Sequence, residues 1–242
     1  MLTIQSFCFN AFQENTYVLY NEQKNAMIVD PGCYLRNEQE ALANFISENN
    51  LKPTLLLNTH CHLDHVFGNN FVSEKYGLAA HFHKNEQPVI DRLPEGGARW
   101  GVPCEPYTGA VEYIAQDDII DFDKDQFKVL LTPGHSPGSV CFYNAGQDFM
   151  IGGDLIFKDG VGRTDLPGCN PLDLINSIKK LTDFILFNDM DGSNDIVEIK
   201  KNELDSNNHL EIIAKIIEII ETTLQNDDQK LKHNYLLSTL DN

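Results

Sequence analysis

The sequence predicts an α+β protein, built as a four-layer αββα sandwich with two mixed β-sheets facing each other and helices outside. Short strand patterns crowd into residues 2–57 and return at residues 111–151. Helical patterns separate the two groups of strands and follow the second group. The chain has 242 residues, of which 42% are hydrophobic, and this is enough to bury a core of real size.

The first group begins with alternating apolar and polar residues, which is typical of a half-buried strand. Residues at helical spacing, such as Leu42, Phe45 and Ile46, indicate a helix farther along. The expected strands are residues 2–9, 16–20, 26–29, 54–57 and 78–82, and the expected helices are residues 38–49, 64–76 and 84–92. Residues 93–106 are rich in Gly and Pro and are predicted to form a long loop of the kind that shapes substrate entrances.

The second group contains more strands, separated by turns. The expected strands are residues 111–114, 117–122, 126–131, 139–143 and 148–151. Pro171 starts a predicted helix over residues 171–181, since proline is favoured at the first helical position. A short apolar strand at residues 196–199 and an amphipathic helix at residues 210–224 follow. We therefore assign residues 1–190 to one domain and residues 191–242 to a divergent C-terminal segment that packs on, or extends, the same domain.

Charge and cysteine content narrow the class of protein. The formal net charge is −18, which repels phosphate backbones and anionic lipid at long range. The six cysteines include no C-x-x-C pair, and neither a secretion signal nor an apolar run of about 20 residues is recognisable. We expect a cytoplasmic protein with a small-molecule substrate and with neither nucleic acid nor membrane as a partner. The oligomeric state stays unknown.

The most informative segment is residues 59–65 (THCHLDH), between a wholly apolar strand and a helix. Side chains two residues apart in an extended chain point the same way, so His60 and His62 can bind one ion. The turn into the helix brings Asp64 and His65 to a neighbouring position. Imidazole and carboxylate ligands suit Zn²⁺, Fe²⁺ or Mn²⁺. A polar loop with surface histidines is the alternative, which three histidines in six residues make improbable.

Two later segments also place polar residues just beyond strands. Residues 131–138 (LTPGHSPG) put His135 at a rigid turn, and Gly152-Gly153 leads directly into Asp154. Each pattern alone is typical of a turn-forming residue. Sites built from several loops gather at strand ends, so the two later segments and residues 59–65 together complete a plausible coordination set.

These motifs carry a family resemblance. The order H-x-H-x-D-H, then T-P-G-H-S-P-G-S, then G-G-D resembles that of the metallo-β-lactamase superfamily. Residues 29–32 (VDPG) and 160–168 (GVGRTDLPG) are similar to those of its small, single-domain glyoxalase II-like (hydroxyacylglutathione hydrolase-like) members. The resemblance covers about residues 1–181 and implies an αββα sandwich with the site at the strand ends between the sheets.

The resemblance also implies a role for each residue of the cluster. The first metal would be bound by His60, His62 and His135, the second by Asp64 and His65, with Asp154 bridging the two. Asp64 and Asp154 are the candidate catalytic carboxylates. Zn²⁺ is the expected ion, one or two per chain, with Fe²⁺ or Mn²⁺ as alternatives. A divalent cation of this kind lowers the pKa of bound water to about 7.

Two further residues each have two interpretations. Asp30 either orients a ligand histidine from behind or forms the turn before Pro31-Gly32. Arg163 either binds a substrate carboxylate through paired hydrogen bonds or holds the loop that contains Asp165.

The C-terminal part departs from the family pattern. The family has one more histidine, in a P-G-H-G-P turn after the helix that corresponds to residues 171–181. Here Lys200 or Lys201 stands near that place, and neither His209 nor His233 has a strand before it. Three alternatives follow: the second ion binds loosely, a lysine ammonium replaces it, or the site works with one metal. We expect an occupied first site and a weak or empty second site.

Three functions follow from the resemblance. The first is hydrolysis of a thioester, such as an acylglutathione, by metal-activated hydroxide. The second is an iron-dependent persulfide dioxygenase, in which His60, His135 and Asp154 would hold one iron. The third is a non-catalytic, metal- or partner-binding member of the fold.

Overall fold

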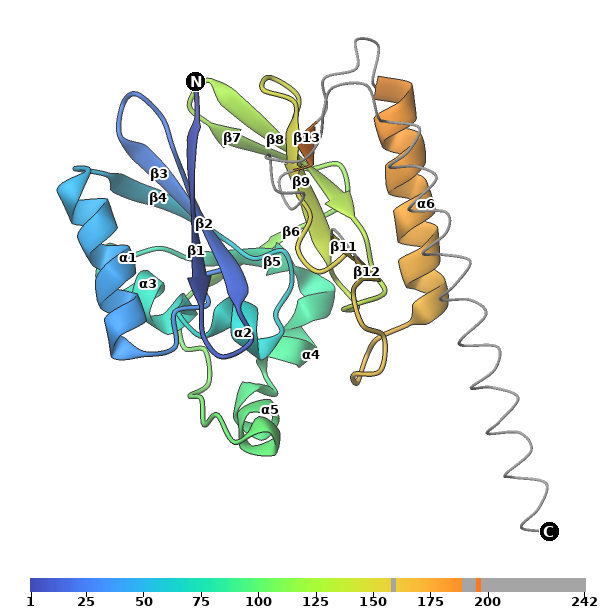
Figure 1. Ribbon diagram of the computed structural model, residues 1–242, viewed down its shortest axis with the longest axis horizontal. Coiled ribbons are helices and arrows are strands. Elements are labelled where there is room, and N and C mark those ends of the chain that lie inside the picture. Colours follow the sequence, from blue (N-terminus) through green and yellow to red (C-terminus); the bar gives the residue numbers. More distant parts are fainter. Residues whose placement is uncertain (158–159, 189–194, 197–242) are drawn as a thin grey trace.

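The computed structural model describes residues 1–157, 160–188 and 195–196. Two β-sheets pack face to face, with helices α1 (Arg36–Glu48) and α3 (Asn69–Tyr76) outside one sheet and α6 (Pro171–Asn188) outside the other (Figure 1). The predicted four-layer αββα sandwich is therefore confirmed.

The first sheet has six strands in the order β1-β2-β3-β4-β5-β6. Their bounds are β1 (Thr3–Phe9), β2 (Glu14–Tyr20), β3 (Asn25–Val29), β4 (Lys52–Leu57), β5 (Ala80–His83) and β6 (Val111–Ile114). The strands β1, β2 and β3 are antiparallel, whereas β3 to β6 run parallel. Parallel strands need a crossover connection, and α1 and α3 lie in two of these connections.

The second sheet has five strands in the order β13-β10-β9-β8-β7. Their bounds are β7 (Ile119–Phe122), β8 (Asp125–Leu131), β9 (Val140–Asn144), β10 (Phe149–Ile151) and β13 (Asp195–Ile196). This sheet is antiparallel except for β13, which pairs with β10 in parallel. A separate two-stranded ribbon, β11 (Ile156–Phe157) and β12 (Gly160–Val161), follows β10.

Alternation along the strands explains why both sheets are covered on both faces. In β3, Met27 and Val29 point into the core between the sheets, whereas Ala26 and Ile28 belong to the core beneath the outer helices. In the second sheet, residues such as Leu130 pack against α6 in a third core. Three apolar cores thus fill the three spaces between four layers, as the period of two in a strand requires.

The remaining helices gather at one edge of the sandwich, the lower edge in Figure 1. They are α2 (Leu63–Val66), the 3₁₀ helix η1 (Lys84–Glu86), α4 (Gln87–Ile90) and α5 (Leu93–Trp100). No helix among the described residues is long and apolar enough to span a bilayer.

The prediction of a long loop at residues 93–106 is wrong in its first half, where α5 forms. Glycines usually disfavour a helix, but Gly97 is needed here because a Cβ atom would lie 2.6 Å from the sulfur of Cys104. Pro94 occupies the first turn of α5, where proline is tolerated. Tertiary packing therefore overrode the local propensity.

Two predicted helices have different bounds in the structure. The helix expected at residues 64–76 is divided into α2 and α3, because the chain bends at Gly68, whose N–H donates to the carbonyl of Pro31 at 2.7 Å. The helix expected at residues 171–181 continues to Asn188. Of the strand expected at residues 196–199, only Ile196 lies within the described residues, and the helix expected at residues 210–224 lies outside them.

Candidate metal centre

Four strand ends, two from each sheet, bring the predicted site residues to one edge of the sandwich. Asp30 directly follows β3, and His60 lies three residues beyond β4 in the first sheet. His135 follows β8, and Asp154 follows β10 in the second sheet. The ends of sheets facing each other form a common edge, so residues distant in sequence meet there.

The three histidines predicted to share one ion lie together. The ring centroids of His60 and His62 are 4.8 Å apart, and the ring of His135 lies 4.8 Å from His60 and 4.6 Å from His62. Nδ1 of His62 lies 2.9 Å from Nε2 of His135. One ligand atom from each histidine lies within 4.8 Å of the others, so the three nitrogens converge on one small volume, as the ligands of a single divalent ion do.

The orientation of each ring fits a metal ion at this place. Nδ1 of His135 lies 2.9 Å from the carbonyl of Arg163, which leaves its Nε2 facing the centre. Nδ1 of His60 lies 3.1 Å from Oγ1 of Thr59. The opposite nitrogen of His60, Nε2, is fully buried without a hydrogen-bond partner among the described residues. Buried polar atoms are normally satisfied, so this unpaired nitrogen fits the role of a metal ligand.

Burial also keeps these imidazoles in the form that binds metal. It lowers the pKa of His60 well below its usual value, aided by the neighbouring histidines. It lowers the pKa of His62 to about 3, with His135 as the next cause, and it lowers the pKa of His135 as well. All three rings are therefore neutral at pH 7, as metal ligation requires.

A second cluster adjoins the first. Nε2 of His65 lies 3.2 Å from Oδ1 of Asp154 and 3.8 Å from Oδ2 of Asp64. The other oxygen of Asp154 lies 3.3 Å from Nε2 of His135, so this carboxylate spans both clusters. This is the position that the resemblance implies for a bridging ligand.

The protonation of the second cluster differs from that of the first. Burial by itself lowers the pKa of His65, but Asp154 and Asp64 outweigh it and raise that pKa well above the usual value. Burial would raise the pKa of Asp154, but His65 and its hydrogen bond lower it to about 2. Burial raises the pKa of Asp64. Without metal, His65 is therefore a protonated imidazolium between carboxylates.

This difference predicts a pH dependence for metal binding. A second ion must displace the proton of His65, so its affinity should rise about tenfold per pH unit between pH 6 and the raised pKa. The first ion meets neutral imidazoles, so its affinity should change much less between pH 6 and 7, below the range in which metal-bound water ionises. Calorimetric titration of Zn²⁺ in two buffers of different protonation enthalpy measures the protons released at each step. Equal proton release at both steps would contradict the assignment.

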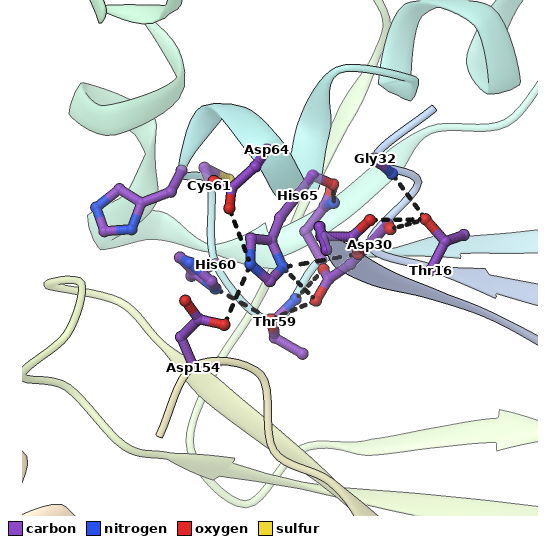
Figure 2. A network of polar contacts seen from close by, with 12 residues as sticks. Thr16, Asp30, Gly32, Thr59, His60, Cys61, Asp64, His65 and Asp154 are labelled. Atoms are coloured by element: carbon purple, nitrogen blue, oxygen red, sulfur yellow. Dashed lines mark hydrogen bonds and ion pairs between the residues drawn. The ribbon is translucent and has the colours of Figure 1, made fainter. Parts of the chain in front are cut away.

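Asp30 holds the second cluster from behind. Its carboxylate accepts hydrogen bonds from the backbone N–H of Thr59 at 2.8 Å and from the hydroxyl of Thr59 at 2.5 Å. Oδ2 also lies 3.1 Å from Nδ1 of His65 (Figure 2). His65 thus lies between Asp30 on one side and Asp64 and Asp154 on the other. The geometry fits the orienting role, and Asp30 also has a left-handed backbone conformation, with a φ of 48°.

Sequence reasoning missed two buried carboxylates beside the site, Glu14 and Glu86. Glu14 accepts a hydrogen bond from the hydroxyl of Thr16, and its Oε1 lies 3.9 Å from Nδ1 of His65. Burial raises the pKa of Glu14. Neither glutamate belongs to a recognisable motif, and only the folded chain brings them to the site.

The glycine of the G-G-D motif has a steric role. Gly153 has a φ of 55°, and a Cβ atom there would overlap the side chain of Thr59. Glycine therefore lets the loop after β10 approach the loop after β4, and this approach delivers Asp154 to His65.

The structure supports one of the two interpretations of Arg163, the one in which it holds the loop that contains Asp165. Nε and Nη2 donate to the two carboxylate oxygens of Asp165 at 2.7 and 2.8 Å, so the guanidinium holds that loop. It also lies 5.8 Å from the ring of Trp100, which is 45% exposed and contacts Phe12. Contact with a substrate stays a prediction. Lys200, Lys201, His209 and His233 lie outside the described residues, so the consequence of the missing histidine also stays a prediction.

The fold and the cluster together define a class of protein, the αββα metalloproteins whose His/Asp site at the sheet edge binds divalent metal. The family model of the metallo-β-lactamase superfamily matches residues 9–186. The chain therefore belongs to the metallo-β-lactamase superfamily.

Relatives and solved structures support this membership. The chain is 33% identical to "Hydroxyacylglutathione hydrolase GloC" of Haemophilus influenzae over 74% of this chain and 83% of that protein. It is 32% identical to the solved structure of the BLEG-1 B3 metallo-β-lactamase, with a TM-score of 0.69 over 75% of this chain and 86% of that chain. It is 30% identical to the structure of TTHA1623 in a di-iron-bound form, with a TM-score of 0.67 over 74% and 86% of the two chains.

Proposed function

We propose that this protein hydrolyses a thioester, such as an acylglutathione, with Zn²⁺ bound by His60, His62 and His135. Family membership supports the coarser statement, a metallo-hydrolase of this superfamily. The observation that carries the proposal is the convergence of three neutral imidazoles on one point, with the orphan Nε2 of His60 among them. The named activity of the Haemophilus relative supports the thioester.

Each residue then has a defined task. A divalent ion bound at such a site acidifies a coordinated water and polarises a carbonyl group. Asp154 holds the two clusters together, because its two oxygens face His135 and His65. Asp64 faces the same space, and the pKa that burial raises makes it a better proton acceptor than an exposed aspartate. Asp30 fixes the ring of His65 through Nδ1.

The substrate side of the site is aromatic. Trp100 lies between Phe12, with ring centroids 6.1 Å apart, and the guanidinium of Arg163. The carbonyl of Arg163 also lies beside Nδ1 of His135, so this cluster adjoins the metal ligands. We infer that Trp100 and Arg163 contact the part of the substrate that does not react.

A second candidate function depends on which metal ion the site binds. The di-iron form of TTHA1623 favours iron as an alternative ion for this site, and iron is what a persulfide dioxygenase would need at His60, His135 and Asp154. The two candidates differ in their substrates and in the use of oxygen. A non-catalytic member of the family would show neither activity.

The deciding experiment loads the purified full chain with Zn²⁺ or Fe²⁺ and counts metal per chain by elemental analysis. We expect the zinc form to hydrolyse S-lactoylglutathione or a model thioester, without oxygen uptake. Oxygen uptake with glutathione persulfide by the iron form, together with no thioester hydrolysis, would replace the proposal with the dioxygenase. Absence of both activities in a metal-loaded chain would leave a binding protein.

Removing the ring of Trp100 should weaken substrate binding more than it slows the chemical step. We expect Trp100→Ala to raise KM for a bulky acylglutathione several-fold while kcat changes little, because the ring contacts Phe12 and Arg163, which are not predicted metal ligands. Tyr113→Ala, which removes an exposed aromatic residue on β6, is the matched control. An unchanged KM in Trp100→Ala would exclude this surface from the substrate site.

A further inference from the structure

Glu86 is a completely buried carboxylate that belongs to neither histidine cluster. It is the last residue of η1. It accepts hydrogen bonds from the loop that contains His60 and His62 and from the loop that contains His135. Its Oε2 accepts from the backbone N–H of Cys61 at 2.7 Å, and its Oε1 accepts from the backbone N–H of Gly138 at 2.6 Å. The hydroxyl of Ser136 lies 2.6 and 2.8 Å from the two oxygens.

Two of these donors directly neighbour predicted metal ligands in the sequence. Cys61 lies between His60 and His62, and Ser136 directly follows His135. The first loop extends from the end of β4 and the second from the end of β8, in different sheets. The backbone N–H of Val140, the first residue of β9, also donates to the carbonyl of Thr59 at 2.8 Å, so a main-chain bond joins the two segments as well. The Glu86 side chain thus links the two loops by hydrogen bonds at residues next to the histidines.

We propose that Glu86 is a positioning residue that sets the distance between the His60–His62 pair and His135. A buried carboxylate is costly unless its oxygens are matched by donors, and here two amides and a hydroxyl provide the match. Cys61 and Ser136 directly neighbour predicted ligands in the sequence, and Gly138 lies three residues beyond His135. The carboxylate therefore fixes three imidazoles in place before metal binds, and this inference rests on the proposed metal centre.

The proposal is tested with Co²⁺, whose visible spectrum reports ligand geometry without any assay of activity. In Glu86→Gln an amide NH₂ must face either the Cys61 or the Gly138 N–H, so one loop loses its hydrogen bond. We expect the full chain carrying Glu86→Gln to bind the first equivalent of Co²⁺ about 10- to 100-fold more weakly, as for other residues that orient metal ligands. The Co²⁺ absorption bands should also shift or broaden.

Glu38 offers a matched control for the same chemical change. Its carboxylate also accepts hydrogen bonds from backbone amides, those of Asn10 at 2.7 Å, Tyr34 at 2.9 Å and Leu35 at 2.8 Å. These bonds cap the start of α1 and do not join the histidine loops. Glu38→Gln should lower the melting temperature but leave the affinity and spectrum of Co²⁺ unchanged.

Wild-type affinity and an unaltered spectrum in folded Glu86→Gln would overturn the positioning role and leave the metal centre intact. Failure of the wild-type chain to bind Co²⁺ would overturn both. If Glu86→Gln does not fold, Ser136→Ala replaces it, because this variant removes the hydroxyl that contacts both oxygens. A weaker first Co²⁺ site in Ser136→Ala supports the proposal, and an unchanged site in that variant contradicts it.

Discussion

Replacing His60 with alanine should abolish thioester hydrolysis by the metal-loaded chain. His60 is fully buried, its Nε2 has no partner among the described residues, and its ring lies within 4.8 Å of those of His62 and His135. Removing one of three ligand nitrogens leaves two, so the ion is lost or displaced. Enzymes typically accelerate reactions about 10⁶-fold or more, and most of this acceleration should disappear with the ion.

The measurement is kcat/KM for a model thioester, beside metal content per chain for each variant. His81→Ala is the matched control, because this histidine of β5 pairs with Glu112 at 3.2 Å and belongs to neither cluster. We expect the control to keep its metal and its rate. Equal rates and equal metal content in wild type and His60→Ala would refute the role of His60 as a ligand and the dependence of hydrolysis on this metal centre.

Replacing Asp30 with alanine should cost about 3 to 5 kcal/mol in the free energy of unfolding of the metal-free chain. The substitution leaves two donors of Thr59 without an acceptor and removes one carboxylate from protonated His65. Alanine also tolerates the φ of 48° poorly. Urea unfolding monitored by circular dichroism measures the loss.

Asp30→Asn removes the negative charge of the side chain but keeps its shape. Asparagine tolerates a positive φ, and its carbonyl can still accept from the N–H of Thr59. We expect it to lose less stability than Asp30→Ala but to bind the second Zn²⁺ more weakly, since His65 loses its carboxylate partner. A loss below about 1 kcal/mol in Asp30→Ala would show that this network contributes no more than an ordinary surface site.

Much of the fold could be predicted from periodicity. Alternation placed the strand over residues 2–9 within about two residues of β1, because a buried face imposes a period of two, and the strand expected between turns at residues 126–131 matches β8 equally well. The loop predicted at residues 93–106 was wrong over α5 because of a tertiary contact. Gly97 contacts residues 102–104 so closely that only glycine fits, and no local pattern reveals such a contact.

The sequence by itself determined the family and the candidate ligands, because three histidines within six residues, followed by His135 and Asp154 after strands, form a local and specific pattern. Only the tertiary structure decided which groups surround them. Glu14 and Glu86 come from segments without any motif, and the αββα packing brings their carboxylates to the histidine loops. Hydrogen bonds between distant segments depend on where whole sheets lie, and this position is a property of the packed core rather than of any short stretch of chain.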